Sequence, residues 1–285
     1  MSVTAAERRG LWGPVKSPDE RFQVWWRTRT GDWISPQGFR RVTGGDGTSV
    51  LKGWERRPPG QGWLWVKGPS RADPRETAGR VVVSTCHDQP MTWAEQARFR
   101  GCRLWAGNNV EGPARDGVVA LPCGVAPNGS TEWKASMVER ALSAPGFPRR
   151  RGGALACWDD HGGWERKALK AQVASWATVP GPLSVAAYVQ ALRSHRWVLS
   201  PAGYGWDCYR TWEALASGAW VVVQRSGLDR SVYEELPVWV VDDWHEVTPL
   251  ALAAQAEVFA ALDWGYDQLT VPWWVRWIRQ RAEES

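Results

Sequence analysis

Short apolar runs alternate with amphipathic segments along the chain from Trp63 onward. The runs have the length of buried strands, and the amphipathic segments repeat apolar residues three and four positions apart, as helices do. The predicted strands are Trp63–Lys67, Arg80–Thr85, Leu104–Ala106, Val118–Leu121, Ala154–Trp158, Arg196–Ser200, Trp220–Val223 and Val238–Val241. The predicted helices are Trp93–Arg100, Thr131–Leu142, Glu165–Trp176, Ser184–Ser194, Asp207–Ser217 and Thr248–Leu262. This alternation indicates an α/β fold with parallel sheets.

Composition divides the chain into further parts. Residues 1–62 are rich in Gly, Pro, Arg and Trp, and Gln23–Thr28 is the segment there with a strand pattern. The segment Ala144–Gly153, APGFPRRRGG, separates two apolar runs and is typical of a linker between domains. We therefore expect an N-terminal domain over 1–147, which includes an irregular basic and Trp-rich extension over 1–62. A second domain is expected over 148–262, and a terminal helical segment over 263–285.

A glycine loop between a strand and a helix lies in the second half of the chain. After the apolar strand, Pro201–Gly205 carries two glycines, and Asp207 is a candidate N-cap for a helix that ends before Gly218. Backbone N–H groups in such a loop can approach an anion, and a helix N-terminus adds partial positive charge. The loop therefore predicts phosphate binding. The amides concerned are those of Gly203, Tyr204 and Gly205.

A longer pattern runs from Ser200 to Thr248. It reads S-P-x-G-x-G-x-D-x-x-R-T-W-E-A-L-x-x-G, then S-x-L-D, Y-E-E-L-P-V and V-D-D-W-x-E-V-T. This pattern resembles the donor-binding half of exostosin-like glycosyltransferases, which are nucleotide-sugar enzymes of the GT-B fold. In the first half, L-W-A-G-N-N followed by V-V-A-L-P-C-G-V is a looser likeness to the same family. The resemblance implies two Rossmann-like domains that face a cleft, with a C-terminal helix that crosses back to the first domain.

The resemblance also implies how a nucleotide sugar would be bound. Glu213, at the W-E position, would accept hydrogen bonds from the ribose hydroxyls; the alternative is a helix-surface carboxylate paired with Arg210. Arg210 and the loop amides would bind the diphosphate. Arg166 and Lys167 would meet it from another helix across the cleft, unless they are a solvated pair on a helix face. The donor implied is a nucleoside-diphosphate sugar, with a UDP-sugar favoured.

Acidic residues elsewhere have candidate roles in the reaction. Asp207 is a motif residue and in the first place a structural cap, and Asp229 would contact the sugar unless it only forms a turn. A glycosyl transfer also needs a base for the acceptor hydroxyl, and the base should come from the N-terminal domain. Asp88 directly follows a predicted strand and is the candidate base, with His87 as its partner or as the base itself. The alternative for this pair is an ordinary cap at the end of a strand.

Cofactor and metal signals are weak in this sequence. The five cysteines are scattered without C-x-x-C spacing, and the four histidines have no ligand spacing. The acidic pairs Asp159-Asp160 and Asp242-Asp243 lack the D-x-D spacing of metal-dependent GT-A enzymes. We therefore expect no required metal and no cofactor besides the nucleotide-sugar co-substrate.

The net charge of +5 is distributed unevenly. Residues 1–150 hold 23 basic against 14 acidic residues, a net charge of +9, and the remainder carries a net charge of −4. The basic half either keeps the protein in solution or receives a polyanion such as nucleic acid. Most of the 23 tryptophans are expected in cores, and some of them to stack on a sugar or base. The N-terminus has no apolar stretch of signal-peptide length and the chain has no membrane-span pattern, so we expect a cytoplasmic protein.

These features lead to one function with two alternatives. We expect a glycosyltransferase that moves a sugar from a nucleoside diphosphate to a hydroxyl, and the favoured acceptor is a 5-hydroxymethylpyrimidine in DNA. A base in a duplex would be flipped out, with an aromatic side chain filling the gap. The first alternative is a glycosyltransferase that acts on a cytoplasmic glycan, a lipid-linked saccharide or a protein. The second is a catalytically silent nucleic-acid-binding module.

Overall fold

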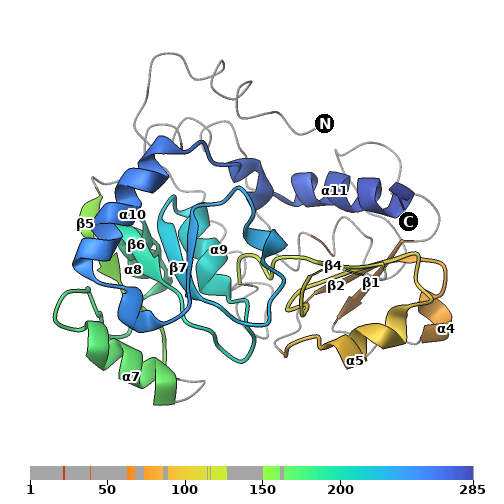
Figure 1. The fold of residues 1–285 in the computed structure, drawn as a ribbon, viewed down its shortest axis with the longest axis horizontal. Coiled ribbons are helices and arrows are strands. Elements are labelled where there is room, and N and C mark those ends of the chain that lie inside the picture. The colour runs from red at the N-terminus through yellow and green to blue at the C-terminus, as the bar shows by residue number, and fades with distance from the viewer. Residues whose placement is uncertain are drawn as a thin grey trace.

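The computed structural model describes residues 22, 39, 63–67, 74–85, 89–113, 115, 117–126, 150–160 and 164–284. These residues form two four-stranded parallel sheets with helices packed against them, which confirms the α/β class. The sheets lie side by side in Figure 1. The strands are β1 Trp63–Lys67, β2 Val81–Thr85, β3 Leu104–Gly107, β4 Val118–Ala120, β5 Arg151–Leu155, β6 His195–Leu199, β7 Trp220–Gln224 and β8 Val238–Val241.

The described helices vary from short turns to fourteen residues. Those of the N-terminal half are α4 Pro74–Thr77, α5 Trp93–Gln96 and the 3-10 helix η2 Ala97–Phe99. The C-terminal half has α7 Trp164–Val173, α8 Val185–Ser194, α9 Tyr209–Ala216, α10 Pro249–Ala261 and α11 Val271–Glu284. Its 3-10 helices are η3 Arg230–Tyr233, η4 Trp244–Glu246 and η5 Tyr266–Leu269.

The N-terminal sheet has the strand order β1-β2-β3-β4, so its neighbours follow one another in chain order. Helix α5 begins after Thr92, as its sequence predicts, and continues into η2. There Phe99 stacks on Trp105 of β3 with ring centroids 3.7 Å apart. In Figure 1, α4 and α5 lie on one side of this sheet and α11 on the other. Both faces of the N-terminal sheet are therefore covered.

The C-terminal sheet, in the order β5-β6-β7-β8, is also covered on both faces. Because side chains alternate along a strand, Trp197 and Leu199 face one side, where α7 and α10 contribute Leu169 and Phe259 to a shared core. Val198 points to the opposite side, where α8 and α9 pack. Burial on both faces explains why β7 is apolar up to its last residue and why β6 is apolar from Trp197 onward.

Helix α11 joins the two halves of the molecule. It follows the C-terminal sheet in sequence, yet Arg103 Nε beside β3 donates a hydrogen bond of 2.9 Å to the carbonyl oxygen of Ala282. Trp274 and Ile278 of the helix are buried in the same core as Val82 and Val221 of the two sheets. Figure 1 shows α11 extending over the N-terminal sheet, the position that the family resemblance implies for the last helix.

Several predicted elements differ from those observed. Strand β5 spans Arg151–Leu155 rather than Ala154–Trp158, because beyond Leu155 the chain bonds with Thr178 instead of β6. Arg150, in the predicted linker, donates to the carbonyls of His195 and Ser217 and so is attached to the C-terminal half. The predicted strand at 23–28 and the predicted helix at 131–142 lie outside the described residues.

Candidate functional site

The carboxyl ends of strands from both sheets meet around one cavity of about 860 Å³. Asn109 follows β3, Cys123 follows β4, Asp159 follows β5 and Gly203 follows β6, and all four line the cavity. Parallel α/β sheets bind their ligands outside this edge, where loops can vary without disturbing the core. Other lining residues include Trp158, Arg166, Lys170, Tyr188, Arg210 and Glu213.

Arg166 lies near the start of α7 and packs onto the glycine loop. Its Nε donates to the carbonyl oxygen of Ala202 at 3.0 Å, and Nη1 forms an ion pair of 3.2 Å with Asp159. A β-carbon at Gly203 would lie 3.4 Å from Nη2 of Arg166, so the guanidinium group packs directly against the backbone of the loop. The side chain is only 8% exposed. Its burial lowers the pKa of Arg166, and the positive charge of Arg210 lowers that pKa further.

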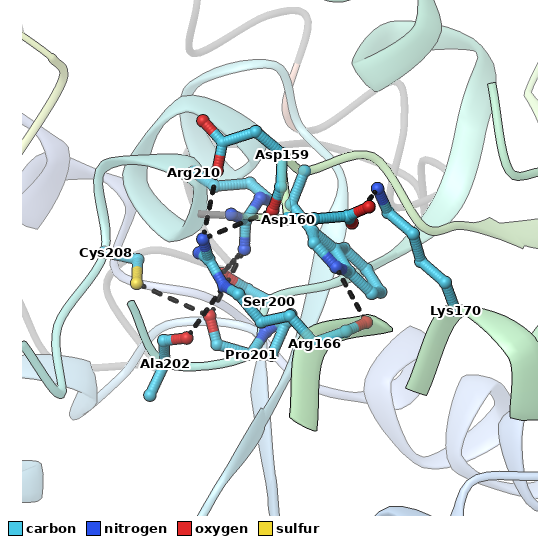
Figure 2. Close-up of polar contacts among 10 residues, drawn as sticks. Asp159, Asp160, Arg166, Lys170, Ser200, Pro201, Ala202, Cys208 and Arg210 are labelled. Carbon is cyan, nitrogen blue, oxygen red and sulfur yellow. Dashed lines mark hydrogen bonds and ion pairs between the residues drawn. The ribbon is translucent and has the colours of Figure 1, made fainter. Parts of the chain in front are cut away.

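Arg210 reaches the same loop from α9. Its Nη1 donates to the carbonyl oxygen of Pro201 at 3.3 Å and lies 3.5 Å from Oγ of Ser200. The guanidinium carbon also lies 5.5 Å from the ring centroid of Trp158, within the range of a cation–π contact. Figure 2 shows Arg166 and Arg210 converging on the loop carbonyls. Two guanidinium groups beside one another repel unless an anion lies between them, so the cavity wall is suited to phosphate.

Lys170 adds a third cation to the cavity. It is four residues after Arg166, on the same face of α7, and its Nζ donates to Asp160 at 2.7 Å. The side chains of Asp159 and Asp160 are themselves largely exposed. Water therefore screens the aspartate end of each ion pair, although Arg166 and Lys170 are themselves mostly buried. An anionic ligand that carries several oxygens can therefore replace the aspartates as the partner of the cations.

Glu213 brings a buried carboxylate to the cavity. It is 5% exposed, and its oxygens accept hydrogen bonds from the Tyr188 hydroxyl at 2.7 Å and from the Ala126 amide at 3.3 Å. Burial raises the pKa of Glu213, whereas both hydrogen bonds and the charge of Arg210 act in the opposite direction. The alternative of a solvated carboxylate on a helix surface is therefore wrong, because Glu213 faces inward.

Asp207 holds the two halves together rather than capping α9. Its carboxylate accepts from the Cys123 amide at 2.7 Å, from Trp212 Nε1 at 2.9 Å and from the Tyr233 hydroxyl at 3.2 Å. Its own amide donates to Oδ1 of Asn109 at 2.8 Å. The predicted N-cap role is wrong: the cap position is Cys208, which has no capping side-chain bond. Asp207 lines the cavity, but its oxygens are occupied by protein donors.

The glycine loop lines the cavity, although one of its amides is already used. The Gly203 amide donates to the carbonyl oxygen of Gly205 at 3.0 Å within the loop. Tyr204, at the tip of this turn, is 68% exposed. The structure thus places all three predicted loop residues at the cavity. An anion in the cavity would therefore be bound mainly by the arginine side chains beside the loop, rather than by the loop amides.

Other predicted site residues lie elsewhere. Lys167 is exposed and is not among the cavity-lining residues, because it is one position from Arg166 and points to another face of α7. Asp229 caps η3 by accepting from the Ser231 amide at 3.0 Å and lines a second cavity instead. His87 and Asp88 lie outside the described residues.

Sequence reasoning missed several residues of the site. Lys170 was detectable, because a spacing of four from Arg166 places both side chains on one helix face. Trp158 is predicted as the end of a strand, and Asp159 has no predicted role; the early end of β5 places both in the cavity wall. The sequence around Tyr188 does not indicate a role in the site, because its hydrogen-bond partner Glu213 lies 25 residues further along the chain.

Comparisons with known proteins add no further assignment. No protein-family model matches the sequence, and a search of curated proteins found no match. Within the described part of the chain, no group of three or more His, Cys, Asp or Glu residues is arranged to hold a metal ion. The helices described here are all too short or too polar to cross a membrane.

The contacts of Asp207 predict a loss of stability in Asp207→Asn. An amide would place an NH₂ group against N–H or O–H donors, and a buried donor without a partner costs about 1–3 kcal/mol. The free energy of unfolding, measured in urea at neutral pH, should fall by that amount. The matched control is Asp242→Asn, which removes a surface ion pair with Arg225 and should leave the unfolding midpoint unchanged. Equal stability of the native protein and Asp207→Asn would contradict the bridging role.

Proposed function

We propose that the cavity binds a nucleoside-diphosphate sugar and that the protein is a glycosyltransferase. The observation that carries the proposal is the pair of adjacent guanidinium groups, Arg166 and Arg210, in a cavity that also holds the buried carboxylate of Glu213. A diphosphate carries negative charge on oxygens that arginine forks bind in pairs. Lys170 adds a third positive charge to the same cavity. A volume of about 860 Å³ is within the range of small-molecule sites.

Glu213 suits the ribose of such a ligand. An ionised carboxylate only accepts hydrogen bonds and offers about four lone-pair positions. Tyr188 and Ala126 supply two donors, which leaves positions for ribose hydroxyls. Because the charge of Arg210 favours the ionised form of Glu213, the diphosphate and ribose partners support one another. The resemblance of this segment to donor-binding motifs agrees with that arrangement.

The reaction proposed is transfer of the sugar to a hydroxyl. The bond from the anomeric carbon to the diphosphate oxygen breaks, the diphosphate leaves with the electron pair, and the acceptor oxygen forms the new bond. A base takes the acceptor proton. Asp88, with His87 as partner or substitute, is proposed for this role because both follow β2, whose carboxyl end belongs to the same sheet edge as Asn109. The cations of the cavity would stabilise the leaving group.

The acceptor proposed is a 5-hydroxymethylpyrimidine in DNA. Its support is the net charge of +9 in residues 1–150, the half that faces the cavity through Asn109, Cys123 and Ala126. A basic surface there would bind phosphates of a duplex. A glycan, lipid-linked saccharide or protein acceptor is the alternative with the same donor. A catalytically silent module that binds nucleic acid is the alternative without transfer.

Removing either arginine should weaken nucleotide binding. Each charge-assisted hydrogen bond to phosphate contributes about 1.5–3 kcal/mol, so Arg166→Gln and Arg210→Gln should each weaken UDP binding by roughly 10- to 100-fold. Calorimetric titration with UDP measures the change. The matched control is Lys167→Gln, which removes a neighbouring cation outside the cavity and should stay within about twofold. Native affinity in both arginine variants would contradict the diphosphate site.

The acceptor is tested by product analysis. The full chain is incubated with UDP-sugars and duplex DNA that contains 5-hydroxymethylpyrimidines. The DNA is then digested, and the masses of the nucleosides are measured by mass spectrometry. The proposal predicts a mass increase of one glycosyl unit with at least one donor, and no increase with unmodified DNA. If UDP binds but no nucleoside gains mass with any donor, the proposal of a DNA acceptor is contradicted, whereas the proposal of a nucleotide-binding site is not.

A further inference from the structure

A second cavity lies where α11 crosses the N-terminal half. Its volume is about 580 Å³, within the roughly 300–1,000 Å³ of small-ligand sites. Asn109 lines the first cavity, and Pro113 and Arg115 of the same segment line the second, so a short stretch of chain separates them. The nucleotide site described above uses none of the groups in this second cavity. Asp229, which the sequence predicts at the donor sugar, lines the second cavity instead.

Tryptophans of α11 form one wall of the second cavity. Trp273 and Trp277 are one helical turn apart, with ring centroids separated by 6.5 Å and planes within 17° of parallel. Both are only partly buried, so their rings present surface to the cavity. Trp274, between them, is fixed by a 2.7 Å hydrogen bond from its indole N–H to the carbonyl oxygen of Gln268. The wall therefore contains two roughly parallel indole rings on one helix.

A buried amide also lines this cavity. Gln268 is 4% exposed, and its Oε1 has no hydrogen-bond partner among the described residues. A buried carbonyl without a donor is costly in a folded protein. Because this oxygen exposes less than 1 Å² of surface, it lies behind the cavity wall and a ligand does not reach it. The acceptor that a ligand can reach is the exposed Glu234, at the margin of the same cavity.

The charges of the lining favour a neutral ligand. Three carboxylates, Asp229, Glu234 and Glu284, stand against two arginines. Arg281 is paired with Glu284 at 3.4 Å and its guanidinium carbon lies 5.4 Å from the ring centroid of Trp277, so a sugar would use the part of that ring that Arg281 does not cover. Arg115 lies 3.3 Å from the ring centroid of Trp93. A polyanion would meet an excess of like charge here, which is unfavourable. Aromatic faces together with hydrogen-bond acceptors instead match a sugar, whose C–H faces are apolar and whose edges carry hydroxyl donors.

We propose that the second cavity binds a neutral saccharide unit. Its pyranose face packs on Trp273 and Trp277, and its hydroxyls donate to Glu234. The proposal goes beyond the nucleotide site and does not depend on it, since neither cavity shares a cation with the other. It gives the protein a carbohydrate-binding site separate from the one proposed for the donor.

Saturation-transfer NMR on the full chain tests this site. The probes are maltose, cellobiose and diacetylchitobiose, each titrated to obtain an affinity. At least one disaccharide should receive saturation, and Trp277→Ala should weaken its binding by at least about tenfold, as loss of an aromatic anchor does. Trp277→Phe, which keeps an aromatic face, should retain most of the binding. Glu234→Gln, at an exposed position, should weaken binding with no effect on folding.

Matched controls separate this site from the nucleotide cavity. Trp244→Ala removes a partly buried tryptophan of η4, away from both cavities, and should leave disaccharide binding unchanged. Arg210→Gln should also leave it unchanged, and UDP should not displace the sugar. The proposal is overturned if no disaccharide receives saturation, if Trp277→Ala and Glu234→Gln both bind normally, or if UDP displaces the sugar. Binding of a thymidine oligonucleotide in place of the disaccharides, lost in Trp277→Ala, would overturn it as well.

Discussion

Hydrogen bonds to one buried carboxylate fix how the two sheets of this protein meet. Asp207 belongs to the C-terminal half, and its carboxylate accepts hydrogen bonds from the Cys123 amide of the other half, from the Trp212 indole N–H and from the Tyr233 hydroxyl. Burial raises the pKa of Asp207, while these donors favour its ionised form. A carboxylate buried in this way is tolerated only when its oxygens are satisfied. The position of the cavity walls therefore depends on contacts made just beneath them.

The hydrogen bonds of Asp207 between the two halves also determine where the charged side chains of the cavity lie. Helix α9 begins at Tyr209, two residues after Asp207, so the bonds of Asp207 fix the start of the helix that carries Arg210 and Glu213 to the cavity. Glu213 repeats the contact between halves, because it accepts from the Ala126 amide. Arg166 arrives separately from α7 and is held by the loop carbonyl of Ala202. Cations and an inward carboxylate thus line one cavity without neutralising one another directly.

Local patterns predicted much of the fold. Strand β8 matches its prediction at both ends, because Pro237 and Asp242 bound a short apolar run. The caps Ser184 and Thr248 are confirmed, since each side chain accepts from an amide three residues on. Strand β5 was misplaced because its first residues, including Gly153, have low strand propensity and pair with β6 through tertiary contact.

The candidate site was predictable only where its signals were local. The glycine loop, Arg210 and Glu213 belong to one continuous motif, and the structure places them at one cavity. The partners of Asp207 were invisible, because its donor Cys123 is 84 residues away and a cap was the simpler local explanation. Lys167 is predicted because it adjoins Arg166 in sequence, whereas the period of a helix places Lys170 on the same face as Arg166.

The central claim is that Glu213 receives the ribose of a nucleoside diphosphate in this cavity. Calorimetric titration of the native protein and Glu213→Gln with UDP and with 2′,3′-dideoxy-UDP measures that contact directly. The account predicts that the native protein prefers UDP by about tenfold or more, as expected for hydrogen bonds to a charged group. Glu213→Gln should lose most of that preference and still bind the diphosphate. Equal affinity of the native protein for the two nucleotides would contradict the account.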